Sequence, residues 1–358
     1  MKIVFVLPAL NDSHHINHVK EFIERGYDVD VYGFERVDRK KPDYGFKVNI
    51  LGILANESYK NRIKLYLNCF HKVGKIYDKN NTIYFLSGLD LSLFFIILNP
   101  GVKYIYEEFD LRHTYMPFTK IWEIIDKHII KKSLVTALTS EGFIDYHWEG
   151  ICPDNVALME NKLNPDITKY CVKDKIFDKK KLSIGFVGGP RYDSVYNFID
   201  VFCRNFPEFQ FHVYGGPILP QFEKLKKYSN CYLHGFFKNP ADLSTIYGSI
   251  DLVLATYDVK YENVRYAEPN KIYESIYFET PIIVSSGTFL ARKVKRLGIG
   301  YDINAMSEQE IIDFVNCITF ESLQKRKENA RAIEKVNTIN INNDFFHVLN
   351  KQMSKKNE

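Results

Sequence analysis

Residues 267–284 read AEPNKIYESIYFETPIIV, and the second half of the chain is organised around this segment. Pro269 stands at a predicted helix start, and Pro281 opens an apolar strand. The first N–H groups of such a helix have no intrahelical acceptor, so they attract anions. Glu274 lies one to two turns into the helix, where a carboxylate can accept hydrogen bonds from hydroxyl groups such as those of a ribose. The segment therefore predicts half of a nucleotide-sugar site.

Composition sets the limits within which the rest of the chain is interpreted. A length of 358 residues suits two domains of ordinary size. The net charge of +4 is too mild to indicate a nucleic-acid partner. Six scattered cysteines without a CxxC pair argue against disulfides or a metal cluster. Every apolar run is too short for a signal peptide or a membrane span. We therefore expect a cytoplasmic protein.

Apolar strand-like runs alternate with amphipathic helical stretches along the whole chain. In the first half the predicted strands cover 2–7, 28–32, 46–51, 82–86, 103–106 and 134–138. A polar segment rich in Lys and Asp, residues 164–181, is the predicted linker. In the second half the predicted strands cover 182–187, 209–214, 231–233, 252–255, 281–285 and 300–302. Repeated β-α-β units predict an α/β fold with parallel sheets and right-handed crossovers.

Glycines follow two strands of the predicted second sheet. They are Gly188 and Gly189 after the first strand, and Gly215 and Gly216 after the next. Ligands of open parallel sheets bind beyond the carboxyl ends of the strands, so these glycines predict a shared ligand-binding edge. Arg191 follows the first pair, where its fork of donors suits a phosphate. The alternatives are turn glycines that only supply φ > 0, and an ordinary surface arginine.

The order of these segments resembles the GT-B glycosyltransferases, in particular the retaining family-4 type found in bacterial surface polysaccharide synthesis. The matching segments in the second half are IGFVGG (184–189), HVYGG (212–216), LHGF (233–236), IDLVL (250–254), EPNK (268–271) with Glu274, and PII (281–283). In the first half they are GYDVDV (26–31), TSEGF (139–143) and Asn161. The resemblance implies two Rossmann-like domains facing a cleft. It implies an acceptor-binding domain over 1–165, a donor-binding domain over 181–338, and a last helix within 339–358 that crosses back onto the first domain.

The resemblance also implies roles for individual residues. Donor binding is expected of Gly188, Gly189, Arg191, Tyr214, Gly215, Gly235, Phe236, Pro269, Asn270, Lys271 and Glu274. Acceptor binding is expected of Asn11, Asp12, His14 and Glu108, and catalysis of Asp110 and Glu268. Purely structural alternatives stay open: a capping or solvated Glu274, a solvent-facing Lys271, and helix-cap or salt-bridge roles for Glu108 and Asp110.

The sequence departs from the family pattern at several positions. Tyr266 stands where the first Glu of the family's E-x7-E is expected, which puts the role of Glu268 in doubt. Phe109 stands where many relatives have a His before Asp110, and residues 9–12 (ALND) replace the usual Gly-Gly loop. No Lys follows Arg191 at the usual short spacing.

The function implied by the resemblance is transfer of a hexosyl unit from a UDP- or GDP-sugar to a glycan or polyprenyl-diphosphate-linked acceptor, with retention. No cofactor or bound metal is expected. The alternatives are a nucleotide-sugar epimerase of the same architecture, or a non-catalytic partner subunit.

Basic stretches occur at 39–41, 131–132 and 179–181. Such stretches are usually just solvated, but on this fold they are compatible with contact at the inner, anionic face of the cell membrane.

Overall fold

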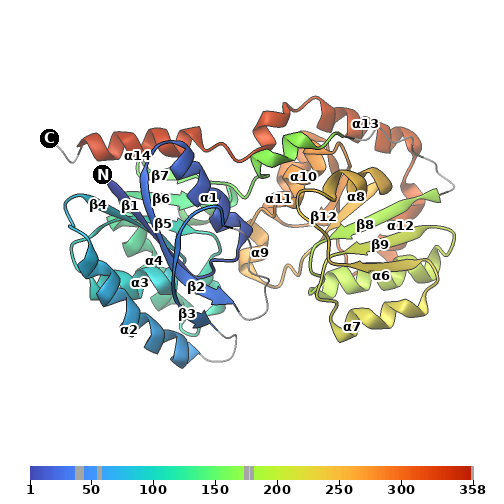
Figure 1. The fold of residues 1–358 in the computed structure, drawn as a ribbon. Coiled ribbons are helices and arrows are strands. Elements are labelled where there is room, and N and C mark those ends of the chain that lie inside the picture. Colours follow the sequence, from blue (N-terminus) through green and yellow to red (C-terminus); the bar gives the residue numbers. More distant parts are fainter. Residues whose placement is uncertain (37–43, 55–58, 173–176, 178–180, 356–358) are drawn as a thin grey trace. The chain divides into compact units, whose positions relative to one another are not determined.

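A computed structural model describes residues 1–36, 44–54, 59–172, 177 and 181–355 (Figure 1). The chain divides into two compact units, one of Met1–Asn161 with Ile341–Glu358, and one of Lys162–Asn340. The basic residues 39–41 and 179–180, and parts of the predicted linker, lie outside the described residues. No helix in the described ranges is long and apolar enough to cross a membrane.

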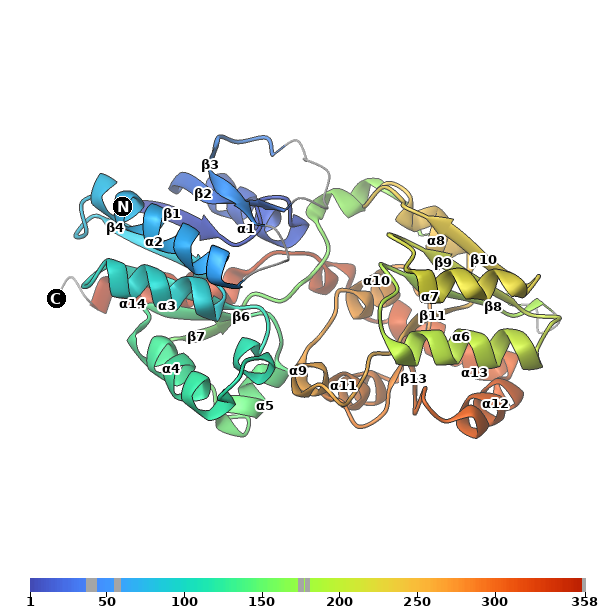
Figure 2. The same ribbon diagram turned by 90° about the horizontal axis from the view of Figure 1, so that it is seen from below.

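The first unit is built on a seven-stranded parallel sheet in the order β3-β2-β1-β4-β5-β6-β7. Its strands are β1 (Lys2–Leu7), β2 (Asp28–Arg36), β3 (Val48–Leu54), β4 (Thr82–Ser87), β5 (Lys103–Glu108), β6 (Val135–Leu138) and β7 (Val156–Leu158). Its helices are α1 (Ser13–Glu24), α2 (Tyr59–Ile76), α3 (Leu89–Leu98), the 3₁₀ helix η1 (Arg112–Tyr115), α4 (Thr119–Lys132), α5 (Gly142–Trp148) and α14 (Asn343–Lys355). Helices α1 and α14 cover one face of the sheet, and α2, α3 and α4 cover the other (Figures 1 and 2). Because helices cover both faces, the central strands are buried on both sides, which explains their continuous apolar runs.

The second unit has a six-stranded parallel sheet in the order β10-β9-β8-β11-β12-β13. Its strands are β8 (Ser183–Val187), β9 (Gln210–Tyr214), β10 (Cys231–Gly235), β11 (Leu252–Ala255), β12 (Ile282–Ser285) and β13 (Gly300–Ile303). Its helices are η2 (Pro165–Lys169), α6 (Asp193–Asn205), α7 (Pro220–Glu223), η4 (Lys224–Lys227), α8 (Leu243–Ser249), α9 (Glu262–Tyr266), α10 (Lys271–Tyr277), α11 (Phe289–Leu297), α12 (Glu308–Cys317), α13 (Phe320–Arg331) and η5 (Lys335–Thr338). The strand order reverses between β8 and β11, which makes the carboxyl end of β8 a topological switch point. The predicted fold class, two parallel α/β domains, is confirmed.

Several elements differ from the sequence-based expectation, among them β2, which continues to Arg36, and β7, which was not predicted. The last helix begins at Asn343 and not near 339, because Ile339 forms a β-bridge with Leu163 and the N–H of Asn340 donates to the carbonyl of Leu163. The helix expected to start at Pro269 begins at Lys271 and has seven residues.

Candidate functional site

Three glycine-containing loops meet at the carboxyl edge of the second sheet. The N–H of Gly188 donates to the carbonyl of Tyr214, and the N–H of Gly215 donates to the carbonyl of Gly235, each at 2.6 Å. A Cβ on Gly215 would lie 2.2 Å from the carbonyl oxygen of Gly188, and one on Gly189 would lie 3.3 Å from that of Gly216. The loops after β8, β9 and β10 therefore pack backbone against backbone at one edge of the sheet, as predicted, whereas ligand binding at this edge stays a prediction.

Helix α10 brings a lysine to these loops. The Cε of Lys271 lies 3.9 Å from the position of a Cβ on Gly188. Its Nζ donates to Oδ1 of Asn270 at 3.1 Å and to Oε1 of Glu274 at 3.0 Å. Lys271 is buried, although lysines in first turns usually face solvent. The neighbouring carboxylate compensates the cost of burying the ammonium group.

Glu274 is fully buried, and its carboxylate has partners within the second unit. Oε1 also accepts a hydrogen bond from Nδ2 of Asn270 at 2.9 Å, and Oε2 accepts one from the hydroxyl of Tyr247 at 2.5 Å. Burial and the charge of Glu274 raise the pKa of Tyr247 well above its ordinary value. All seven residues of α10 are buried, so the alternative of a solvated Glu274 does not hold.

The remaining predicted donor residues lie at the same edge in different environments. Arg191 is exposed, and its guanidinium donates to the hydroxyl of Tyr192 at 3.1 Å. Phe236 is 80% exposed, and a Cβ on Gly216 would lie 3.1 Å from its ring. The ring of Tyr214 stacks on His234 with centroids 4.2 Å apart.

Glu268 lies just before α10 and is buried with a cation. Its Oε1 lies 2.6 Å from Nζ of Lys293, which comes from α11. Pro269, which follows Glu268, is half-buried. These contacts give Glu268 a structural partner, in keeping with the doubt that its spacing raised.

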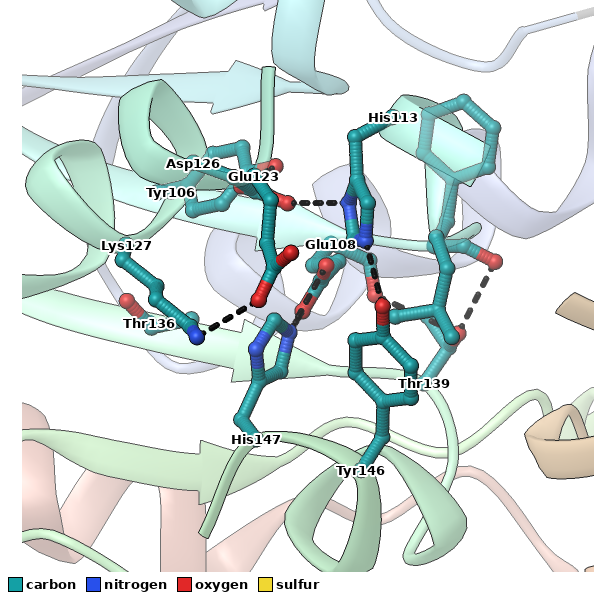
Figure 3. A network of polar contacts seen from close by, with 12 residues as sticks. Tyr106, Glu108, His113, Glu123, Asp126, Lys127, Thr136, Thr139, Tyr146 and His147 are labelled. Carbon is teal, nitrogen blue, oxygen red and sulfur yellow. Dashed lines mark hydrogen bonds and ion pairs between the residues drawn. The ribbon is translucent and has the colours of Figure 1, made fainter. Parts of the chain in front are cut away.

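Glu108, at the end of β5 in the first unit, belongs to a buried polar network (Figure 3). Its two carboxylate oxygens lie 3.1 and 2.9 Å from Nε2 of His147. Nearby, Nδ1 of His113 lies 2.9 Å from Oδ2 of Asp126, and Nε2 of His113 lies 2.9 Å from the hydroxyl of Tyr146. Burial and the adjacent charge of Asp126 raise the pKa of Glu108 well above its ordinary value. Glu108 is thus enclosed by the first unit itself.

Glu107, the preceding residue, points to the opposite face of the sheet and meets three histidines of α1. Its Oε1 lies 2.8 Å from Nε2 of His14 and 2.9 Å from Nδ1 of His18, and its Oε2 lies 3.5 Å from Nε2 of His15. Burial opposes ionisation of Glu107, but the histidines outweigh it and hold its pKa well below the ordinary value. Burial lowers the pKa of His14, but the charge of Glu107 outweighs this effect and the net pKa is raised.

The other predicted acceptor residues have local roles. Asp12 is the N-cap of α1 and accepts a hydrogen bond from the N–H of His14 at 3.2 Å, and Nδ2 of Asn11 donates to the carbonyl of Arg36 at 3.3 Å. Asp110 is half-buried at the carboxyl edge, and its carbonyl accepts a hydrogen bond from the N–H of Arg112.

The sequence interpretation missed Glu107, His18, His113 and His147 as members of these clusters. One available signal was the pair of adjacent glutamates in an otherwise apolar strand. Because successive strand residues face opposite sides of a sheet, Glu107 and Glu108 each need a buried partner on a different face.

Comparisons with known proteins support the fold. No protein-family model and no curated protein matches this sequence. Among solved structures, the chain is similar to sucrose-phosphate synthase from Thermosynechococcus elongatus, with a TM-score of 0.71, 10% identity, and coverage of 99% of this chain and 98% of that one. It is also similar to Anabaena HepE in complex with UDP and glucose, with a TM-score of 0.69, 13% identity and coverage of 99% of both chains. The apo lipopolysaccharide outer core galactosyltransferase WaaB gives a TM-score of 0.65 at 16% identity, covering 99% of this chain and 100% of that one.

Proposed function

We propose that this protein is a glycosyltransferase that moves a hexose from a nucleotide diphosphate sugar to a glycan or lipid-linked acceptor. The observation that supports it best is the edge of the second sheet, where the Gly188 and Gly215 loops meet Lys271 at the switch point. Ligands of such sheets bind at this position. The glycosyltransferase fold of the neighbours, and the UDP and glucose named for HepE, favour a nucleotide sugar over other phosphate ligands.

In the proposed reaction the bond between the sugar and the diphosphate breaks, and negative charge grows on the departing phosphate. The ammonium group of Lys271 would stabilise this charge, and the exposed guanidinium of Arg191 would add bidentate hydrogen bonds. Glu274 and Asn270 hold Lys271 in place, so we assign them first to positioning. The contact of Glu274 with a ribose stays a prediction, since it requires the carboxylate to exchange one of its present partners.

We propose that the acceptor binds at the carboxyl edge of the first sheet. Asp110 is the candidate base there, because it is half-buried, whereas Glu108 is enclosed. Asn11, Asp12 and His14 flank the same edge at the start of α1. We further propose retention of configuration without a protein nucleophile and without a metal in the transfer step.

The surface of α4 suggests a lipid-linked acceptor at the inner face of the cell membrane. Three large apolar side chains are exposed on this helix or at its N-cap: Phe118 by 78%, Ile121 by 57% and Ile124 by 70%. Four lysines are exposed on the same helix, namely Lys120, Lys127, Lys131 and Lys132. Exposed apolar groups beside several cations suit the interface of an anionic bilayer.

The test is incubation of the purified protein with UDP-, GDP- and TDP-sugars, with and without acceptor. Slow release of free sugar and nucleotide diphosphate without acceptor is expected, together with a higher thermal midpoint in the presence of the preferred donor. An isomerised nucleotide sugar would identify an epimerase. If the protein neither converts nor is stabilised by any of these nucleotide sugars, the result would favour a non-catalytic subunit.

A further inference from the structure

Two histidines and one glutamate converge on a single point on the α1 side of the first sheet. His14 and His18 are four residues apart on α1, so both rings lie on one face of the helix. Glu107 approaches from β5, and its Oε1 is 2.8 Å from Nε2 of His14 and 2.9 Å from Nδ1 of His18. All three ligand-type atoms lie within 4.8 Å of one another. Glu107 and His18 are buried, whereas the side chain of His14 is 12% exposed.

The surroundings orient these three groups toward one another. Oε2 of Glu107 accepts a hydrogen bond from Ser87, whose Oγ in turn lies 2.8 Å from Nε2 of His15. Nε2 of His14 is directed at Oε1 of Glu107, 2.8 Å away. A partner such as Ser87, which holds the second oxygen of the carboxylate, is typical of metal sites in proteins.

His18 indicates that hydrogen bonding alone does not account for the cluster. Its Nδ1 is buried and makes no hydrogen bond within the described part of the chain, although Oε1 of Glu107 is only 2.9 Å away. The oxygen is close enough but lies off the direction of a ring N–H. A buried, unsatisfied nitrogen destabilises the fold, and a cation bound to its lone pair would remove that cost.

We propose that His14 Nε2, His18 Nδ1 and Glu107 Oε1 form a binding site for a divalent transition-metal ion, with Zn²⁺ best suited. Two imidazoles and one carboxylate are a known zinc ligand set, whereas Mg²⁺ and Ca²⁺ prefer oxygen ligands only. The three side chains would fill three of the four coordination positions of the ion. Because His14 is partly exposed, the fourth coordination position would face solvent. His14 belongs both to this site and to the proposed acceptor edge, but the proposed transfer step itself uses no metal.

A second cluster, Glu108, His113 and Asp126, has a similar composition but does not support the same inference. Both ring nitrogens of His113 are hydrogen-bonded, one to Asp126 and one to Tyr146, so its ring has no buried, unsatisfied nitrogen like that of His18 (Figure 3).

The test is titration of the full-length, chelator-treated protein with Co²⁺, followed by visible absorption. All variants carry His212→Gln, because Nδ1 of His212 and Nε2 of His234 lie 3.0 Å apart at the surface and could bind the ion by themselves. One equivalent of Co²⁺ with intense four-coordinate bands is expected, and Zn²⁺ should displace it and raise the thermal midpoint. His18→Gln and His14→Gln should each weaken binding at least about 10-fold. The matched control, His128→Gln on the exposed face of α4, should bind as the parent does.

Two results would overturn the proposal. One is a parent protein that gives neither the bands nor the thermal shift. The other is a folded His14→Gln variant that binds Co²⁺ as tightly as the parent. Since His14 is the partly exposed ligand, its variant keeps the test decisive even if His18→Gln fails to fold.

Discussion

The hydroxyl of Tyr247 donates a hydrogen bond to Oε2 of Glu274 over 2.5 Å, and both side chains are buried. Tyr247 comes from α8 and Glu274 from α10, so the bond ties together two helices on the same face of the second sheet. A buried carboxylate is stable only when several donors point at it. The order of the proposed donor site therefore depends on this contact as well as on Lys271.

Replacement of Tyr247 by Phe should destabilise the second unit. The change keeps the ring but removes one donor from a buried carboxylate, which should lower the free energy of unfolding by about 1–3 kcal/mol in urea titrations. Tyr228→Phe is the matched control, because the hydroxyl of Tyr228 donates to Asp200 at a partly exposed position. If both variants lose the same free energy of unfolding, the buried carboxylate of Glu274 does not depend on the hydroxyl of Tyr247 for its stability.

Replacement of Lys271 by Met should weaken binding of nucleotide diphosphates. Loss of a hydrogen bond from a charged donor costs about 1.5–3 kcal/mol, so the Kd for UDP measured by calorimetry should rise by roughly 10- to 150-fold. Lys295→Met, which removes an exposed cation from α11, should leave the Kd unchanged. Circular dichroism must show that both variants fold. Unchanged affinity in a folded Lys271→Met protein would contradict the proposed donor site.

The fold was largely predictable because its signals are local. Central strands such as β1 and β4 are largely apolar runs of six residues, and the glycines after Val187 and Tyr214 mark where two strands of the second sheet end. The first three strands of the second sheet are consecutive in the chain and adjacent in the sheet. The meeting of their loops could therefore be predicted without knowledge of contacts between distant parts of the sequence.

The partners of buried charges were not predictable in the same way. His14 and Glu107 are separated by 93 positions, and their contact depends on which helix covers which face of the first sheet. Likewise, Glu274 is enclosed because α10 is packed on all sides, which a seven-residue amphipathic pattern does not reveal. Periodicity shows that a residue faces inward, but not which side chain it meets.

Substitution of Gly215 by Ala should disrupt the three loops more than substitution of Gly235. At Gly215 the φ angle is +129° and a Cβ would lie 2.2 Å from the carbonyl oxygen of Gly188, so backbone must move. At Gly235 the φ angle is +75°, but no atom lies within 4 Å of the position of an added Cβ. An alanine there should therefore lose only the free energy of a left-handed backbone conformation, on the order of 1 kcal/mol. Thermal unfolding and UDP titration should both rank Gly215→Ala as the more damaged variant. The reverse ranking would show that the loops are not in backbone contact.

His147 should make stability depend on pH. Burial lowers its pKa below the ordinary 6.5, with Lys127 acting in the same direction and Asp126 and Glu123 opposing it. The unfolded chain therefore binds a proton at a higher pH than the folded chain does. The stability from neutral His147 is complete above about pH 6.5 and is lost as the pH falls toward the folded value.

His147→Gln provides the comparison, because the amide can still donate to Glu108. The difference in unfolding free energy between wild type and this variant should shrink as the pH falls from about 7 to 5 in urea titrations. A difference that is constant over this range would show that burial does not shift His147.

Replacement of the three exposed apolar residues Phe118, Ile121 and Ile124 by Ser should weaken binding to anionic vesicles. Phe118 is the N-cap of α4, the two isoleucines lie on the helix, and all three side chains are exposed. Insertion of such groups at a bilayer interface contributes roughly in proportion to the apolar area buried. The bound fraction in flotation with phosphatidylglycerol vesicles should fall at least about 10-fold. Ile76→Ser with Ile97→Ser is the matched control, since both residues are similarly exposed but lie on α2 and α3.

The lysines of α4 predict that membrane binding also depends on lipid charge and on salt. Lys120, Lys127, Lys131 and Lys132 are exposed, and each cation near an anionic surface contributes about 1 kcal/mol. Binding should therefore weaken when salt is raised and should be weak on neutral phosphatidylcholine vesicles, because screening and loss of lipid charge remove the same attraction. Equal binding to both lipids, or equal loss in the control pair, would show that α4 does not contact the membrane.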